Sequence, residues 1–206
     1  MPTSRTRTGS KRQRRSPAAV RSATLHASRA LLFREGPAAI TMPAVAKELG
    51  MSHGNLTHHF GSIGALQAAL VDQMAQELAS AVHTAVHRLR DENANPIEVV
   101  NAVFGAFSDG GAGQLISWLA STDNMDALKP LFKTISKAVR ELSEGQEALG
   151  DEFAPSTRQN ALMLLAAAIG NALIGERLHT AVGLPQGTLS KLCASDVIRR
   201  IDTAQR

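Results

Sequence analysis

Residues 41–70 read TMPAVAKELGMSHGNLTHHFGSIGALQAAL, and this stretch decides how the rest of the chain is interpreted. Thr41 can cap a helix that has Pro43 in its first turn, where the missing N–H of proline costs nothing. Gly50 can end that helix, because glycine adopts the left-handed conformation without penalty. Ser52 can then cap a second helix almost at once. The stretch therefore predicts two short helices joined by a tight turn, followed by the start of a long third helix.

The second short helix has two faces of different chemistry. Leu56 and Phe60 lie four residues apart and are predicted to face the protein interior. The opposite face carries hydrogen-bonding side chains without strong charge, namely His53, Asn55, Thr57 and His58. Such a helix at a sharp turn is typical of a helix-turn-helix, whose second helix enters the major groove of DNA. An ordinary helical hairpin in a bundle has the same periodicity, so the pattern alone leaves both interpretations open.

The residues themselves favour the first interpretation. Residues 20–70 resemble the DNA-binding domain of the TetR family, and the matching positions are Ala46, Leu49, Gly50, Ser52, Gly54, Leu56, His59, Phe60, Ser62 and Leu66. The resemblance implies a sequence-specific transcription regulator, which we expect to be a repressor. The chain departs from the family at Thr57, where a phosphate-binding tyrosine is usual, and at Ile63, where a lysine is common.

Ten residues are expected to contact double-stranded DNA. They are Arg12, Arg14, Arg15, Thr41, Ser52, His53, Gly54, Asn55, Thr57 and His58. An asparagine is suited to bidentate pairing with adenine, and a histidine can donate to guanine or to phosphate. Gly54 lacks a Cβ, so the helix could approach a base or the DNA backbone closely there. A solvated surface ring is the alternative interpretation for each histidine.

Positive charge is concentrated in the same part of the chain. Residues 1–60 hold 10 Lys and Arg against 2 acids, a balance of +8, and the rest hold 12 against 16, a balance of −4, which together give +4. Phosphate neutralisation by such cations supplies most non-specific affinity for DNA. Residues 1–16 have too few apolar side chains for a core, so we predict a disordered basic arm that follows phosphates or enters a minor groove. A solubilising tail is the alternative.

The whole chain of 206 residues is predicted to be all-α, since hydrophobic residues make up 44% and no β-type alternation occurs. We expect a basic arm over 1–16, a three-helix DNA-binding domain over 17–61, a connecting helix over 62–90 and a helical ligand-binding and dimerisation domain over 91–206. The one cysteine fits a reducing cytosol, so a cytoplasmic location is expected. No apolar run reaches the roughly 18 residues that span a bilayer, so no membrane contact is expected.

The run AAAIGNALIG at 166–175 is too small and too apolar for a free surface. It is therefore part of a core within one chain or of a contact between subunits. In TetR-like regulators the last two helices pair with those of a second copy, and the resemblance implies such a homodimer here. Twofold packing would present two recognition helices about 34 Å apart, which suits a palindromic operator.

The C-terminal half also holds the large side chains that could line a pocket for a small-molecule effector. The expected ligand-binding residues are Phe104, Phe107, Trp118, Phe132, Asn160 and Met163. Such a mixture suits a mostly apolar molecule fixed by a few hydrogen bonds, although large apolar residues at helical spacing also form ordinary cores.

Enzymatic chemistry and cofactor binding are not predicted. The sequence shows no nucleophile with a matching base, no nucleotide-binding loop and no cysteine cluster. His83 and His87 are four residues apart, a spacing that could hold a metal ion, but no cluster of further ligands accompanies them. Two alternatives remain. One is a helical small-molecule carrier or enzyme with an incidental hairpin, which binding of an apolar ligand without operator affinity would favour. The other is a regulator that has no small-molecule ligand and acts through a protein partner or as an activator.

Overall fold

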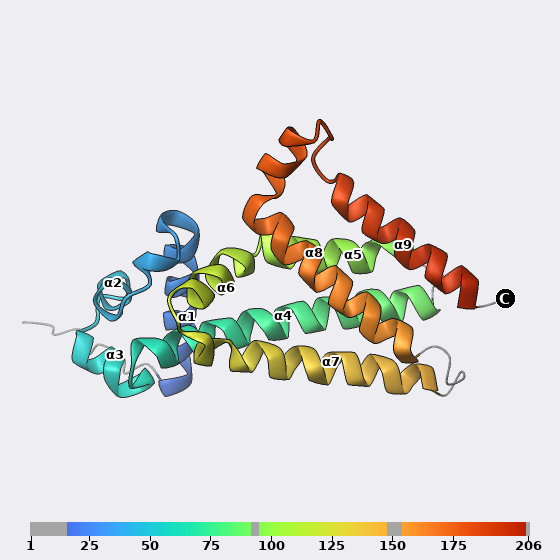
Figure 1. Cartoon of the computed structure of the whole chain (residues 1–206). Helices are drawn as coiled ribbons and strands as arrows, with labels where there is room; N and C mark the ends of the chain where they lie inside the picture. Colours follow the sequence, from blue (N-terminus) through green and yellow to red (C-terminus); the bar gives the residue numbers. More distant parts are fainter. Residues whose placement is uncertain (1–15, 92–94, 148–153, 205–206) are drawn as a thin grey trace, which may run out of the picture.

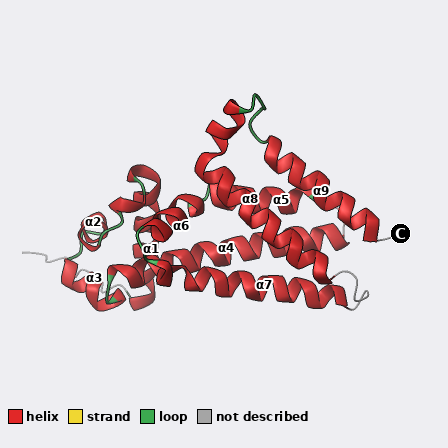
Figure 2. Ribbon diagram, viewed as in Figure 1, coloured by secondary structure: helices red, strands yellow, loops and turns green. Residues whose placement is uncertain are grey.

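The computed structural model describes residues 16–91, 95–147 and 154–204, and within these ranges the chain consists of helices and short connections (Figure 2). We call residues 16–61 the head and residues 95–204 the body. The head holds α1 (Pro17–Glu35), a 3-10 turn η1 (Pro37–Ala39), α2 (Met42–Glu48) and α3 (His53–Phe60). The expected all-α fold is confirmed.

A single long helix, α4 (Ile63–Asp91), runs from the head along the body (Figure 1). The body adds five further α-helices and a second 3-10 turn, which are α5 (Ile97–Ser108), α6 (Ala112–Ser121), η2 (Met125–Leu128), α7 (Lys129–Glu147), α8 (Ala154–Ala181) and α9 (Thr188–Ala204). α7 lies beside α4, and α8 crosses over the body before α9 returns toward the C-terminal end. The head and the C-terminus therefore lie at opposite ends of the molecule.

The helix ends follow the capping chemistry expected from the sequence. The Thr41 hydroxyl accepts a hydrogen bond from the Ala44 amide at 3.3 Å, and the Ser52 hydroxyl accepts one from the Asn55 amide at 3.3 Å. Each satisfies an amide that the first turn of its helix leaves without a partner. Gly50 has a φ of +60°, the left-handed conformation that separates α2 from the turn. These local signals fix where α2 ends and α3 begins.

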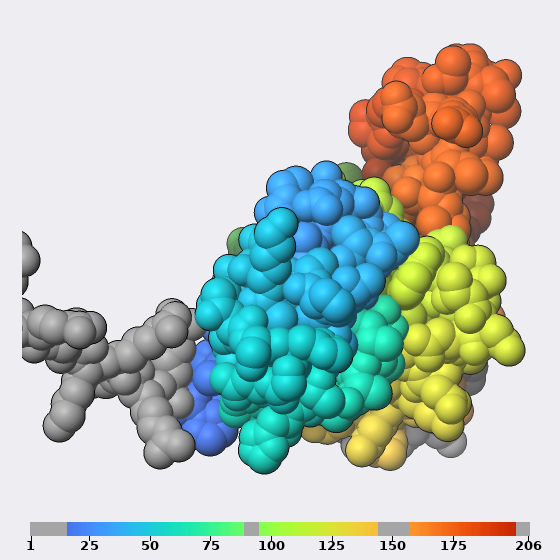
Figure 3. Space-filling model, turned by 90° about the vertical axis from the view of Figure 1, so that its left-hand side faces the viewer, coloured from blue at the N-terminus to red at the C-terminus, as the bar shows by residue number. Residues whose placement is uncertain are grey.

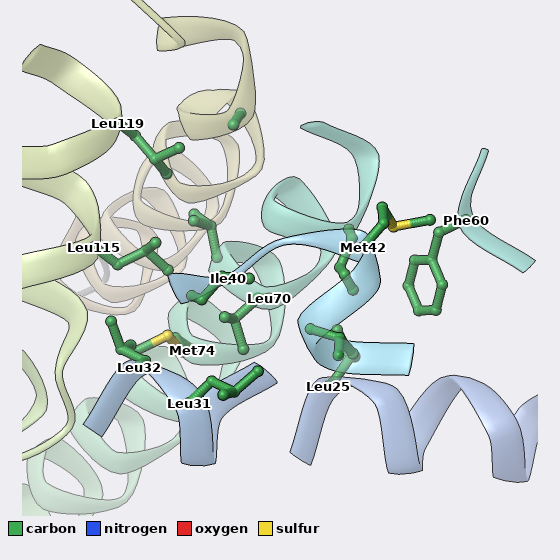
Figure 4. Packing of buried hydrophobic residues seen from close by; sticks show 14 of the residues in the cluster. Leu25, Leu31, Leu32, Ile40, Met42, Phe60, Leu70, Met74, Leu115 and Leu119 are labelled. Atoms are coloured by element: carbon green, nitrogen blue, oxygen red, sulfur yellow. The ribbon is translucent and has the colours of Figure 1, made fainter. Parts of the chain in front are cut away.

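The first core cluster joins the head to the body. Leu31, Leu32 and Ile40 of the head pack with Leu70 and Met74 of α4 and with Leu115 and Leu119 of α6 (Figure 4). Each of these side chains is at least nine-tenths buried. The connection between the two parts is therefore a shared apolar interior as well as a continuous helix.

A second core cluster lies between α5, α8 and α9, with a contribution from α4. Its buried members are Leu78, Val100, Val103, Phe104, Phe107, Leu164, Ala168, Cys193, Ala194 and Val197. Burial raises the pKa of the Cys193 thiol, with a smaller contribution from the charge of Asp196. The thiol is therefore kept protonated and packs as a small apolar group.

Two hydroxyl groups lie on the buried face of α1. Thr24 and Ser28 are fully buried, and each hydroxyl donates to the carbonyl oxygen four residues earlier, Val20 at 2.8 Å and Thr24 at 2.9 Å. Because these bonds satisfy the hydroxyls inside the helix, the two residues occupy interior positions without an unpaired polar group.

α8 is long and mostly apolar, although no uninterrupted apolar run of about 18 residues occurs in it. Of the described helices, the stretch Thr157–Ala181 could cross a membrane by length and composition, and 17% of it is buried. The sequence prediction considered uninterrupted apolar runs, whereas α8 disperses a few polar side chains through a mostly apolar helix. The exposed apolar side chains of α8 raise the question of which surface covers them.

Candidate nucleic-acid interface

α3 is fixed to the head by its inner face. Leu56 is fully buried, and Phe60 is 7% exposed against the first core cluster. α2 packs beside it through Val45 and Ala46, which are likewise buried. The Met51 amide donates to the Ala46 carbonyl at 2.9 Å, which closes the turn between the two helices. The recognition helix is therefore held rigidly at both ends.

The opposite face of α3 points into solvent at the end of the molecule shown in Figure 3. Four of its residues are exposed, and we call them the outer face of α3: His53, Gly54, Asn55 and His58. Ser52 and Thr41, the capping residues, are exposed as well. Thr57 is half-buried, and its hydroxyl donates to the His53 carbonyl at 3.0 Å. Of the described residues expected to contact DNA, all but Thr57 are exposed.

Gly54 has no role in the packing of the head. A Cβ built at this position meets no atom within 4 Å, and the residue is exposed in a regular helix. Glycine in a helix interior costs about 0.5–1 kcal/mol relative to alanine. Packing within the protein thus does not require glycine at position 54. Close approach of another molecule would be a reason for it.

The acidic side chains of the described head are paired with an arginine. The two acids of the described head, Glu35 and Glu48, both contact Arg34, at 2.8 and 2.6 Å. Hydrogen bonding to Glu48, and then to Glu35, raises the pKa of Arg34. The guanidinium of Arg21 lies 4.8 Å from the centre of the Phe60 ring, close to the C-terminal end of α3.

Two exposed cations of the head were not predicted as DNA contacts. Arg21 stacks on Phe60, and Lys47 lies in the last turn of α2. Their positions close to the helix-turn-helix residues were the feature of the sequence that could have indicated such contacts. Of the ten predicted contacts, Arg12, Arg14 and Arg15 lie outside the described residues.

The comparison with family models agrees with this geometry. Residues 25–70 match the model described as "Bacterial regulatory proteins, tetR family". The match extends from within α1 through η1, α2 and α3 to the start of α4. These residues therefore carry the DNA-binding domain of the TetR family. Among curated protein sequences, none is similar enough to this chain to count as a match.

Solved structures are similar in fold to most of this chain. A transcriptional regulator from Rhodococcus sp. Rha1 has a TM-score of 0.61 at 20% identity, covering 86% of this chain and 93% of that one. The multidrug binding protein EbrR, complexed with imidazole, has a TM-score of 0.59 at 18% identity, covering 87% and 93%. At such identities the likeness establishes the fold, with a helix-turn-helix head and a helical C-terminal domain.

The TetR-family match over residues 25–70 supports a role as a DNA-binding transcription regulator, and regulators of this family are not enzymes. The predictions of the family, the fold class and the regulatory role are thereby confirmed. The individual DNA contacts, the effector and the sign of regulation are treated below as proposals.

The six residues expected to bind an effector are not brought into one pocket. Phe104, Phe107 and Met163 belong to the second core cluster or pack against it. Trp118 packs at the edge of the first cluster, and Phe132 lies on α7 with 53% of its surface exposed. The sequence could not separate these positions, because helical spacing does not say which of two clusters a side chain joins.

Asn160 is the polar member of the predicted set. Its Oδ1 atom is buried without a hydrogen-bond partner among the described residues. The enclosed space beside Phe107, lined also by Met74 and Leu115, measures about 10 Å³. That volume holds at most one water molecule, so an organic molecule would have to part the helices to enter.

Proposed function

We propose that the protein is a homodimeric transcriptional repressor that binds a palindromic operator and is released from it by a mostly apolar small molecule. The observation that carries the DNA-binding part is the outer face of α3, which is polar, free of formal charge and displayed at one end of the molecule. A location in the cytoplasm, with access to DNA, belongs to the same proposal.

The outer face of α3 divides into residues suited to bases and residues suited to phosphates. We assign base contacts to His53, Asn55 and His58, because an amide and imidazoles present donors and acceptors without repelling any base edge. Thr41, Ser52 and Thr57 would contact phosphates through hydroxyl or backbone groups, and Gly54 would allow close approach. The cations Arg12, Arg14 and Arg15 would supply phosphate neutralisation that α3 itself does not provide.

The homodimer is proposed to form through α8 and α9. The α8–α9 apolar face consists of Leu173, Ile174, Leu178, Val182 and Leu192, which are between 45% and 59% exposed in a single chain. Monomeric soluble proteins rarely leave so large a contiguous apolar patch in water. A second copy packed about a twofold axis would cover it and would pair two heads for an operator with two half-sites.

The effector is proposed to enter between α5 and α8. Phe104, Phe107 and Met163 would supply apolar contact there, and the unpaired Oδ1 of Asn160 would accept a hydrogen bond from the ligand. Trp118 and Phe132 lie elsewhere and have no place in this proposal. Parting α5 from α8 would shift the population toward a dimer whose heads are spaced wrongly for the operator.

Selection of bound sequences from random duplex DNA tests the proposal most directly. We expect enrichment of a palindrome whose half-sites lie about one helical turn apart. Enrichment of a single half-site would contradict the twofold arrangement, and absence of any enriched sequence would contradict base reading by α3. A small molecule that binds the full chain without changing affinity for the selected operator would contradict release by the effector.

A further inference from the structure

Two histidine side chains on α4 converge at a distance from the outer face of α3 and from the α8–α9 apolar face. His83 and His87 are both exposed, and their ring centres lie 4.3 Å apart. Their Nε2 atoms are 3.2 Å apart. Residues four apart share one side of a helix, so a single point in solvent can be reached by both rings.

The separation of the two nitrogen atoms fits chelation of one metal ion. Imidazole nitrogens bind zinc at about 2.0–2.1 Å, so two nitrogens at this separation subtend an angle of about 100° at a shared ion. This angle lies between the octahedral and tetrahedral values. A ring-to-ring hydrogen bond would also explain the distance, and titration with metal ions distinguishes the two interpretations.

A hollow and a carboxylate lie beside His83. His83 lines a hollow of about 190 Å³ between α4 and α7, together with Ser80 and Glu141. The Glu141 carboxylate adds negative character to this hollow, although Lys137 lies 3.7 Å from it. Arg88, next to His87 in the sequence, pairs with Glu98 of α5 at 2.7 Å. Arg88 and Lys137 are thus engaged with carboxylates.

We propose that His83 and His87 bind one divalent transition-metal ion through their Nε2 atoms, with water in the remaining positions. Among the described residues, no group of three or more potential ligands occurs. Imidazole ligands suit Ni²⁺, Cu²⁺ and Zn²⁺, and they bind Mg²⁺ and Ca²⁺ poorly. The bound ion would clamp one turn of the helix that joins head to body.

Calorimetric titration of the full chain, without a histidine tag, with NiCl₂ and ZnCl₂ tests this site. We expect one ion per chain, and at least a tenfold loss of affinity in each of His83→Ala and His87→Ala. His26→Ala is the matched control, because His26 is an exposed histidine on α1, and it should bind as the unchanged protein does. Titration with MgCl₂ under the same conditions should give no heat of binding.

Two outcomes would overturn the proposal. The first is absence of Ni²⁺ and Zn²⁺ binding, which would leave the two rings as a hydrogen-bonded pair. The second is unchanged binding by a His83→Asn, His87→Asn double variant, which would place the ion elsewhere, for example at the neighbouring rings of His58 and His59. Far-ultraviolet circular dichroism of each variant shows that the helices are intact, and neither outcome depends on operator binding.

Discussion

The outer face of α3 and the α8–α9 apolar face are both exposed in a single chain, yet they differ completely in chemistry. The first presents two imidazoles, an amide and a glycine, whereas the second presents leucine, isoleucine and valine. A polar face without formal charge can satisfy the donors and acceptors of base edges. An apolar face gains free energy when another apolar surface covers it and removes it from water. The difference in composition is why we propose DNA as the partner of the first face and a second copy of the chain as the partner of the second.

The largest expected effect comes from charging the apolar face. Ile174→Asp combined with Leu178→Asp should convert the dimer to a monomer, because two carboxylates per chain would be buried without partners. Loss of the second head should lower operator affinity by about 10²–10⁴-fold, the range of a lost avidity effect. Light scattering coupled to size-exclusion chromatography, without detergent, measures the mass.

Phe132→Asp is the matched control for this experiment, since Phe132 is 53% exposed and lies on α7, outside the α8–α9 apolar face. That variant should stay dimeric. A dimer that survives both substitutions in α8 would show that another surface joins the copies. A chain that requires detergent to remain in solution would instead favour a membrane as the cover of α8.

The next effect is on base reading. Asn55→Ala should cost about 1–3 kcal/mol on the selected operator and should relax preference at one base position in each half-site. Fluorescence anisotropy with operator variants gives both quantities. Asn101→Ala, an exposed asparagine of α5, should change neither. Equal weakening on every DNA sequence would move Asn55 from base contact to phosphate contact.

Gly54→Ala separates folding from recognition. The added methyl group meets no atom of the protein, so the free energy of unfolding should stay the same or rise by up to about 1 kcal/mol. Operator affinity should fall, because the methyl group would hold α3 away from the DNA. Chemical denaturation and anisotropy measure the two effects, and unchanged affinity would mean that this part of α3 stays clear of the DNA.

The smallest effect concerns the basic arm. Arg12→Ala or Arg14→Ala should reduce the slope of log affinity against log salt by about one unit if the arginine contacts a phosphate. The loss should be similar on operator and on unrelated DNA, which distinguishes it from the effect of Asn55→Ala. An unchanged slope would remove that arginine from the interface.

The helix-turn-helix was predictable from sequence because its determinants are local. Thr41, Gly50 and Ser52 act within four residues of their own positions, and Leu56 and Phe60 show their inner face by spacing alone. The outward direction of the α3 polar residues followed from the same spacing.

Other features depend on partners that are distant in the sequence and were not predictable. Trp118 and Phe132 have the composition of pocket residues, but tertiary packing assigns one to the edge of the first cluster and the other to solvent. The stacking of Arg21 on Phe60 joins elements that are far apart along the chain. The burial of Thr24 was not predictable for another reason. Hydropathy counts its hydroxyl as polar, although the hydroxyl donates a hydrogen bond within its own helix.

The apolar interior that the head shares with α6 has a practical consequence for dissecting the protein. Cutting the chain after α4 would remove Leu115 and Leu119 from the first core cluster. Leu31, Leu32 and Ile40 would then lose these contacts and be exposed to water on the excised fragment. Such a fragment would aggregate or melt at modest temperature. Operator-binding experiments therefore require the uncut chain, and mutations in α6 can weaken DNA binding without touching it.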